Sequence, residues 1–186
     1  GLIAESFEKG LSNSIQIISA GFGETKSGRE IEAGLAKKLR ELPRERRPVI
    51  NGPNTLGNIY YDTKTLFTPG YKSSFNGKGR ANAALICQSG AYMITRMSDL
   101  ASMVAPPVAI SVGNQMDLSV ADFLEFFLED ERIATYGLYI EGLVPGDGLR
   151  LMKLSQKARE EGKFVIMYKV GRTEAGAEAA KGHTAS

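Results

Sequence analysis

The chain of 186 residues carries 23 basic and 21 acidic side chains, one histidine and one cysteine. This near balance of charge gives no argument for a nucleic-acid or membrane-surface protein, and the single cysteine, Cys87, excludes an internal disulfide framework and a cysteine-cluster metal site. No apolar run approaches the ~20 residues of a membrane span. The N-terminus shows no signal-peptide pattern, so we expect a soluble, cytoplasmic protein.

The first third of the chain has the pattern of two helices alternating with two short strands. The predicted elements are a helix over residues 2–9, a strand over 15–19, a helix over 28–41 and a strand over 48–51. In the second helix, Ile31 and Leu39 recur on one face, which predicts that this face is buried. From residue 60 to residue 80 the periodicity disappears, so we expect an irregular link there and a domain boundary near residues 77–79.

The remaining residues alternate regularly between short apolar strands and amphipathic helices. The predicted elements are strands over 83–87, 108–112, 136–140 and 164–168, and helices over 91–102, 120–128 and 149–160. Ser119 and Asp122 have the spacing of a capping box in front of the middle helix. This alternation is typical of an α/β fold in which helices cover both faces of a parallel sheet.

Ligands of such sheets bind beyond the carboxyl ends of the strands. Ser89 and Gly90 follow one strand and begin a helix, whose free backbone N–H groups and dipole favour phosphate. Glu141 follows another strand, and His183 lies on a glycine- and alanine-rich loop after the last one. If Glu141 holds one imidazole nitrogen of His183, the other nitrogen is free as a nucleophile. Each piece also has an ordinary interpretation: a plain strand-to-helix turn, a solvated carboxylate and a structural histidine.

Six motifs occur in order along the chain. They are GPNTLG (52–57), CQSGA (87–91), SVGNQMD (111–117), DFLEFFLED (122–130), LYIEG (138–142) and KVGRTEAGAEAAKGHT (169–184). Together they resemble the nucleoside-diphosphate-forming acyl-CoA synthetases, relatives of the α subunit of succinyl-CoA synthetase. The resemblance covers nearly the whole chain, and six ordered motifs are far more specific than any one of them.

The resemblance implies a reaction in which acyl-CoA, phosphate and ADP interconvert with free acid, CoA and ATP through an acyl phosphate and a phosphohistidine. By motif position, His183 is then the phosphorylated residue and Glu141 its orienting carboxylate. The residues implied at the phosphate are Ser89, Gly90 and Ala91. The residues implied near CoA are Ser19, Ala20, Gly21, Pro53, Asn54 and Thr55.

The resemblance also implies cofactors and partners. CoA binds to this chain, whereas ATP or ADP and Mg²⁺ bind to a separate ATP-grasp domain or subunit. The substrate is a small carboxylic acid or its acyl-CoA, the assembly is an oligomer, and no metal site, nucleic acid or membrane is implied for this chain.

We expect two domains. Residues 1–78 form the C-terminal part of a Rossmann-like CoA-binding domain with its link, and residues 79–186 form a flavodoxin-like domain with the phosphohistidine loop. The chain starts at Gly1 without an initiator methionine, so we expect a segment of a longer polypeptide. The glycine-rich CoA-binding half and the ATP-grasp part lie outside this segment, which should not complete a turnover alone.

Two departures from the family pattern are Thr55, where the family often has cysteine, and Cys87, where it often has serine. Either could tune the choice of acyl group. An alternative function is a CoA-ligase-like regulatory domain of a protein lysine acetyltransferase. Those domains frequently lack the phosphorylatable histidine, so His183 favours the enzyme. A flavodoxin-like interaction domain without a cofactor is the third interpretation.

Overall fold

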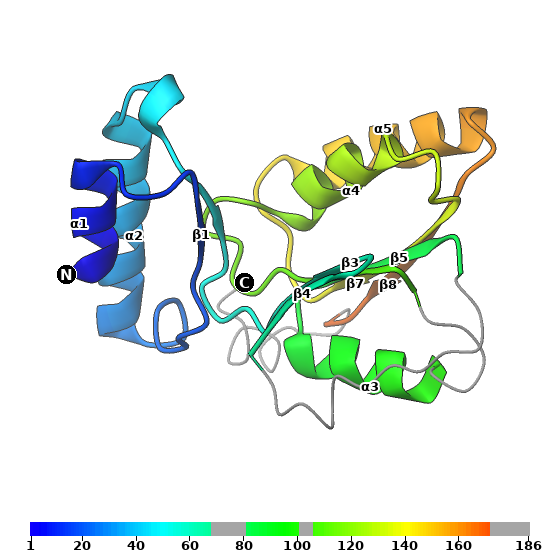
Figure 1. The fold of residues 1–186 in the computed structure, drawn as a ribbon, viewed down its shortest axis with the longest axis horizontal. Helices are drawn as coiled ribbons and strands as arrows, with labels where there is room; N and C mark the ends of the chain where they lie inside the picture. The colour runs from blue at the N-terminus through cyan, green and yellow to red at the C-terminus, as the bar shows by residue number, and fades with distance from the viewer. Residues whose placement is uncertain (68–80, 101–105, 172–186) are drawn as a thin grey trace.

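The computed structural model describes residues 1–67, 81–100 and 106–171, which form two lobes (Figure 1). The N-terminal lobe contains α1 (Leu2–Lys9), β1 (Ser14–Gln16), α2 (Lys26–Glu41), the short 3₁₀ helix η1 (Arg44–Arg46) and β2 (Val49–Asn51). Strands β1 and β2 pair in parallel. The two helices and two strands predicted from the sequence are therefore confirmed, with ends that differ by a few residues.

The local sequence explains the ends of the two N-terminal helices. Gly10 closes α1 in the left-handed conformation, with φ of 59°, which glycine adopts at little cost. Thr25 caps α2 by accepting a hydrogen bond from the backbone N–H of Gly28. Leu39 is buried as predicted, but Ile31 is 58% exposed, so the expected apolar face of α2 is only partly covered.

The core of the N-terminal lobe is small. Buried side chains from both helices and both strand segments meet there, namely Phe7, Ile17, Leu39 and Ile50. Met116, which belongs to a loop of the second lobe, packs against this cluster. The second lobe thus completes the core of the first.

The second lobe is built on a six-stranded sheet in the order β4-β3-β6-β5-β7-β8. Its strands are β3 (Gly57–Tyr60), β4 (Thr63–Leu66), β5 (Ala83–Cys87), β6 (Val108–Ser111), β7 (Thr135–Ile140) and β8 (Phe164–Lys169). The last four strands run parallel, as predicted. The α/β fold class is confirmed.

The expectation of an irregular link starting at residue 60 was wrong for its first part. Strands β3 and β4 form a hairpin, and β3 pairs antiparallel with β6 at the edge of the sheet. The segment is mostly polar, and among its side chains Ile59 is the one buried in the core. A single buried anchor gives too weak an alternation to predict a strand. The second sheet therefore includes residues from the N-terminal side of the expected boundary.

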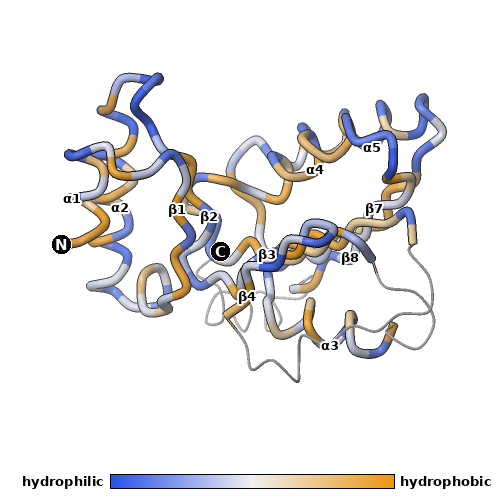
Figure 2. Tube along the Cα trace, viewed as in Figure 1, coloured by the Kyte–Doolittle hydropathy of each residue, from blue (hydrophilic) through white to orange (hydrophobic). Residues whose placement is uncertain are grey.

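Helices cover the sheet on both faces (Figure 1). The helix α3 (Gly90–Leu100) lies on one face, while α4 (Val120–Leu128) and α5 (Asp147–Glu160) lie together on the other. Figure 2 shows hydrophobic residues along the strands and at intervals along the helices, as expected for helices with one buried face. The predicted capping box of Ser119 and Asp122 is present at the start of α4.

Hydrogen bonds join the two lobes along β2. The backbone N–H of Ile50 donates to the carboxylate of Asp117 at 2.8 Å, and the N–H of Leu118 donates to the carbonyl of Ile50 at 3.1 Å. The side chain of Asn51 donates to the carbonyl of Ser111 at 3.0 Å. The end of β2 is thereby fixed against the loop that follows β6, and the carboxyl ends of the two sheets lie together.

Candidate functional site

A pocket of about 240 Å³ lies where the strand-end loops of the two lobes meet. Its lining residues are Ile18, Asn54, Thr55, Leu56, Gln88, Ser89, Gly90 and Ala91. Two groups that the sequence predicted separately are therefore neighbours: the loop at residues 53–55 and the first turn of α3. The pocket lies beyond the carboxyl ends of the strands, where ligands of parallel sheets bind.

The start of α3 contributes backbone donors to this pocket. Ser89 caps the helix, because its hydroxyl accepts a hydrogen bond from the N–H of Tyr92 at 3.2 Å. The N–H groups of Gly90 and Ala91 make no hydrogen bond to another described residue, as is usual in a first helical turn. Together with the helix dipole, these two donors favour an anion.

Glycine at position 90 is required by close packing. A Cβ there would lie 2.5 Å from the Cβ of Leu56, which is a severe overlap. The absence of a side chain therefore lets α3 start directly against the loop between β2 and β3. Leu56 and Gly90 both line the pocket.

Thr55 occupies its position in the pocket with its hydroxyl already hydrogen-bonded. The hydroxyl donates to the carbonyl of Ser111 at 2.5 Å and accepts from the N–H of Gly57 at 3.0 Å. It also lies 3.3 Å from the side-chain nitrogen of Asn51. Thr55 thus shapes the wall of the pocket but holds its polar atom away from a ligand.

Pro53 and Asn54 are fixed by contacts to both lobes. The carbonyl of Pro53 accepts a hydrogen bond from the N–H of Asn114 at 2.9 Å. The N–H of Asn54 donates to the carbonyl of Ser19 at 3.1 Å. Pro53 is buried behind the pocket, whereas Asn54 lines it.

Ser19, Ala20 and Gly21 are exposed and follow Ile18, which lines the pocket. They are not part of the pocket wall. Their predicted contact with CoA stays a prediction.

Glu24 is a structural residue of the site that the sequence did not reveal. One carboxylate oxygen accepts hydrogen bonds from the side chains of Asn54 and Asn114, at 3.1 and 3.2 Å. The other accepts from the N–H of Gly21 at 2.9 Å. Three strand-end loops are therefore tied to one carboxylate. A glutamate in a glycine-rich loop was the only local signal, and its partners lie 30 and 90 residues away.

Glu141 is 7% exposed and follows the last residue of β7. Its N–H donates to the side-chain oxygen of Gln88 at 2.5 Å, and its carbonyl accepts from the ammonium group of Lys169 at 2.6 Å. Burial and the adjacent Glu141 carboxylate raise the pKa of Tyr139 to about 12. The backbone of Glu141 is thus held from two neighbouring strands. His183 lies outside the described residues, so its predicted meeting with Glu141 stays a prediction.

Cys87 ends β5 behind the pocket and is 1% exposed. Burial raises the pKa of its thiol to about 12, so the group is protonated at neutral pH. Cys87 is therefore a packing residue in this structure.

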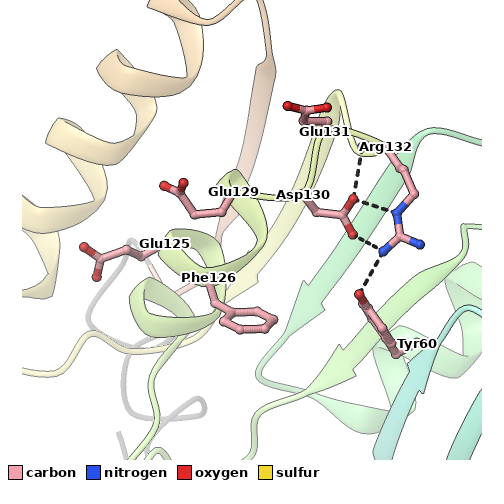
Figure 3. Close-up of a pocket in the computed structure, with 7 residues that line it drawn as sticks. All are labelled: Tyr60, Glu125, Phe126, Glu129, Asp130, Glu131 and Arg132. Atoms are coloured by element: carbon pink, nitrogen blue, oxygen red, sulfur yellow. Dashed lines mark hydrogen bonds and ion pairs between the residues drawn. The ribbon is translucent and has the colours of Figure 1, made fainter.

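A larger pocket, of about 690 Å³, lies at the far end of α4 (Figure 3). Asp130 and Arg132 form an ion pair there at 2.7 Å, and Arg132 also donates to the hydroxyl of Tyr60 at 2.9 Å. Hydrogen bonds from Arg132 are the largest cause that lowers the pKa of Asp130 to about 2. Asp130 and Arg132 thus satisfy each other, and none of the predicted site residues lines this pocket.

No group of three or more histidine, cysteine, aspartate or glutamate side chains within residues 1–67, 81–100 and 106–171 is arranged to hold a metal ion. None of the helices in this part of the chain is both long and apolar enough to span a membrane.

Comparison with known proteins identifies the family. The model of the succinyl-CoA ligase-like flavodoxin domain matches residues 80–186. The chain belongs to this family. The predicted resemblance is thereby confirmed. The matched residues include the parallel strands β5 to β8 and the helices α3, α4 and α5.

Relatives match the whole chain. The α subunit of ADP-forming acetate–CoA ligase I from Pyrococcus furiosus is 36% identical over 100% of this chain and 38% of its own length. The ADP-forming acetate–CoA ligase of Methanocaldococcus jannaschii is 34% identical, again over 100% of this chain but 24% of its own length. This chain thus spans well under half of either relative.

A solved structure with a similar fold is the dinucleotide-forming acetyl-coenzyme A synthetase 1 of Ca. Korarchaeum cryptofilum in complex with phosphate and ADP. It superposes with a TM-score of 0.80 at 30% identity, over 100% of this chain and 38% of that protein. The agreement extends over both lobes, because the whole of this chain is covered.

Proposed function

We propose that this chain is part of an ADP-forming acyl-CoA synthetase, which interconverts acyl-CoA, ADP and phosphate with a carboxylic acid, CoA and ATP. The observation that carries the proposal is the pocket in which the first turn of α3 meets the loop at residues 53–55. Relatives with the names of ADP-forming acetate–CoA ligases support it. They also favour a small acyl group, in keeping with a pocket of about 240 Å³.

The phosphoryl group of an acyl phosphate suits the start of α3. The N–H groups of Gly90 and Ala91 and the helix dipole stabilise its negative charge, and Ser89 holds the first turn in shape. The wall formed by Asn54 and Thr55 faces the acyl end. CoA supplies a thiol that exchanges with phosphate at the acyl carbon, and its longer part extends along Ser19, Ala20 and Gly21.

His183 then accepts the phosphoryl group. An imidazole nitrogen attacks phosphorus, the bond between phosphorus and the acyl oxygen breaks, and the carboxylate leaves with the electron pair. The carboxylate of Glu141 orients the ring by accepting a hydrogen bond from the other imidazole N–H, and the fixed backbone of Glu141 gives this carboxylate a defined direction. The proposal for Glu141 rests on its position beside the first turn of α3.

The nucleotide belongs to another part of the enzyme. ATP or ADP, with Mg²⁺, binds to an ATP-grasp domain or subunit that receives the phosphoryl group from His183. The Pyrococcus furiosus relative is named as an α subunit, which supports a partner subunit. We assign the assembly to the cytoplasm.

The test is ATP formation by the full-length protein together with its ATP-grasp partner. With acetyl-CoA, ADP, Mg²⁺ and phosphate, the natural protein should form ATP and the His183→Ala variant should not. ATP formation at the natural rate by the variant would contradict the phosphohistidine mechanism. Binding of acyl-CoA without ATP formation by the natural protein would favour the regulatory domain instead.

A further inference from the structure

Gln88 lies between the two parts of the proposed site. It follows β5 and precedes the cap residue of α3, and it is 1% exposed. Its backbone N–H donates to the carbonyl of Tyr139 at 3.0 Å, and its carbonyl accepts from the N–H of Gly113 at 3.2 Å. The residue is therefore fixed from two neighbouring strand ends.

The orientation of the Gln88 carboxamide follows from its partners. Its oxygen accepts hydrogen bonds from the N–H groups of Glu141 and Gly142, at 2.5 and 2.9 Å. Only the oxygen of a carboxamide can accept, so the nitrogen occupies the other side of the group. That nitrogen is buried and has no acceptor among the residues that the structure describes.

A buried donor without an acceptor is unusual in a folded protein and calls for an explanation. Gln115 provides a direct comparison, because it is a second buried glutamine on a neighbouring strand-end loop. Its oxygen accepts from the N–H of Val120 and its nitrogen donates to the carbonyl of Gly142, at 3.1 and 3.3 Å. Gln115 is satisfied by the protein at both ends, whereas Gln88 is satisfied at one.

We propose that the side-chain nitrogen of Gln88 donates a hydrogen bond to an anionic oxygen of the phosphoryl ligand at the start of α3. This inference rests on the proposed function and deepens it. Gln88 lines the same pocket as Gly90 and Ala91. In this account a tetrahedral oxyanion that the two backbone N–H groups bind also accepts from the side-chain nitrogen of Gln88. A neutral carboxamide adds a donor without adding a charge to the buried site.

The same side chain links the ligand to Glu141. A hydrogen bond donated at one end of a carboxamide polarises the group and strengthens the bonds accepted at the other end. Phosphoryl binding therefore tightens the hold of Gln88 on the N–H groups of Glu141 and Gly142. Gln88 is in this account a binding and positioning residue that fixes the Glu141 backbone when the ligand is present.

The experiment measures binding of inorganic phosphate by calorimetry, with the full-length protein and its ATP-grasp partner. The Gln88→Glu variant keeps an acceptor for Glu141 and Gly142 but replaces the donor with a like-charged oxygen. We expect its phosphate Kd to rise at least tenfold. The matched Gln115→Glu variant keeps its acceptor for Val120 and loses the bond to Gly142. It should melt at a lower temperature with an unchanged phosphate Kd.

A folded Gln88→Glu protein that binds phosphate within twofold of the natural Kd would overturn the inference. If this variant does not fold, the natural protein is labelled with ¹⁵N-glutamine instead, and its side-chain amide resonances are recorded by NMR. A glutamine amide resonance that shifts on saturation with phosphate supports the inference, and its absence contradicts it. Neither readout requires the enzyme to turn over. If phosphate binding depends on Gln88 but the protein forms no ATP, the inference about Gln88 stands and only the proposed function is contradicted.

Discussion

Gly90 at the start of α3 lies so close to Leu56, in the loop between β2 and β3, that a Cβ on the glycine would come within 2.5 Å of the Cβ of Leu56. Two segments 34 positions apart in the chain thus both line the candidate site. The contact is possible because Gly90 has no side chain. A substitution at Gly90 therefore tests how the pocket is shaped.

The Gly90→Ala substitution should push the first turn of α3 away from Leu56. Overpacking of this kind costs about 1–3 kcal/mol of unfolding free energy, and it should weaken phosphate binding because the two backbone donors move. Denaturant unfolding and phosphate calorimetry measure the two effects. The control is Gly34→Ala in α2, where a Cβ meets nothing within 4 Å. That variant should gain about 0.5–1 kcal/mol, and equal stability losses in both variants would contradict the packing argument.

Glu24→Gln should loosen the attachment between the strand-end loops. The charged carboxylate accepts from Asn54, Asn114 and the N–H of Gly21, and the amide cannot accept from all three. Hydrogen bonds to charged groups contribute about 1.5–3 kcal/mol, so we expect a loss of that order in urea unfolding. Glu30→Gln, at an exposed position of α2, serves as the control and should change little. Equal effects of the two substitutions would contradict the view that the Glu24 carboxylate holds the strand-end loops together.

Cys87 should resist alkylation in the folded protein. Its pKa rises from the ordinary 9.0 to about 12 through burial, so at pH 8.5 the folded thiol is protonated as well as covered. Iodoacetamide should modify it only as fast as the protein opens, and rapidly in guanidinium. Modification at similar rates in both conditions would show that the thiol is exposed.

The same pKa shift predicts a loss of stability in alkali. Between pH 9.0 and about 12 the unfolded thiol releases its proton while the folded thiol keeps it. The unfolded state then binds fewer protons, and the unfolding free energy falls as the pH rises. Urea unfolding at pH 8 and pH 10 should show a steeper loss in the natural protein than in Cys87→Ser, which has no thiol to ionise. Equal losses would contradict the contribution of Cys87.

The sequence predicted most elements of the fold because their signals are local. Gly10 ends α1, the capping box of Ser119 and Asp122 begins α4, and apolar periodicity marks the parallel strands. The β3–β4 hairpin was missed because Ile59 alone anchors it in the core. Ile31 was expected to be buried by its helical spacing, but spacing does not say how far a neighbouring element extends.

The site could be predicted in part. The first turn of α3 and the loop at residues 53–55 carry recognisable motifs, and the structure brings them into one pocket. Glu24 and Gln88 could not be assigned, because their roles depend on hydrogen bonds to residues 30 to 90 positions away. Such pairings arise from the order of strands in the sheets, which local patterns do not encode.

Glu141→Gln should slow phosphorylation without unfolding the protein. The backbone of residue 141 is held by Gln88 and Lys169 through main-chain atoms, and the substitution leaves these bonds in place. Loss of the orienting carboxylate should lower the rate of phosphoenzyme formation by at least about tenfold. For comparison, a general acid or base typically contributes ~10²–10⁴-fold to a rate. Rapid-quench single-turnover kinetics measures this rate, and a natural rate in a variant with the natural melting temperature would remove Glu141 from the mechanism.

The central claim is a phosphoryl group carried by His183, and labelling tests it most directly. The full-length protein is mixed with its ATP-grasp partner, Mg²⁺ and radiolabelled ATP, and the bound label is treated with acid and with base. The account predicts a label that is labile in acid, stable in base and absent from the His183→Ala variant. A label that survives acid, or one that persists in His183→Ala, would contradict it.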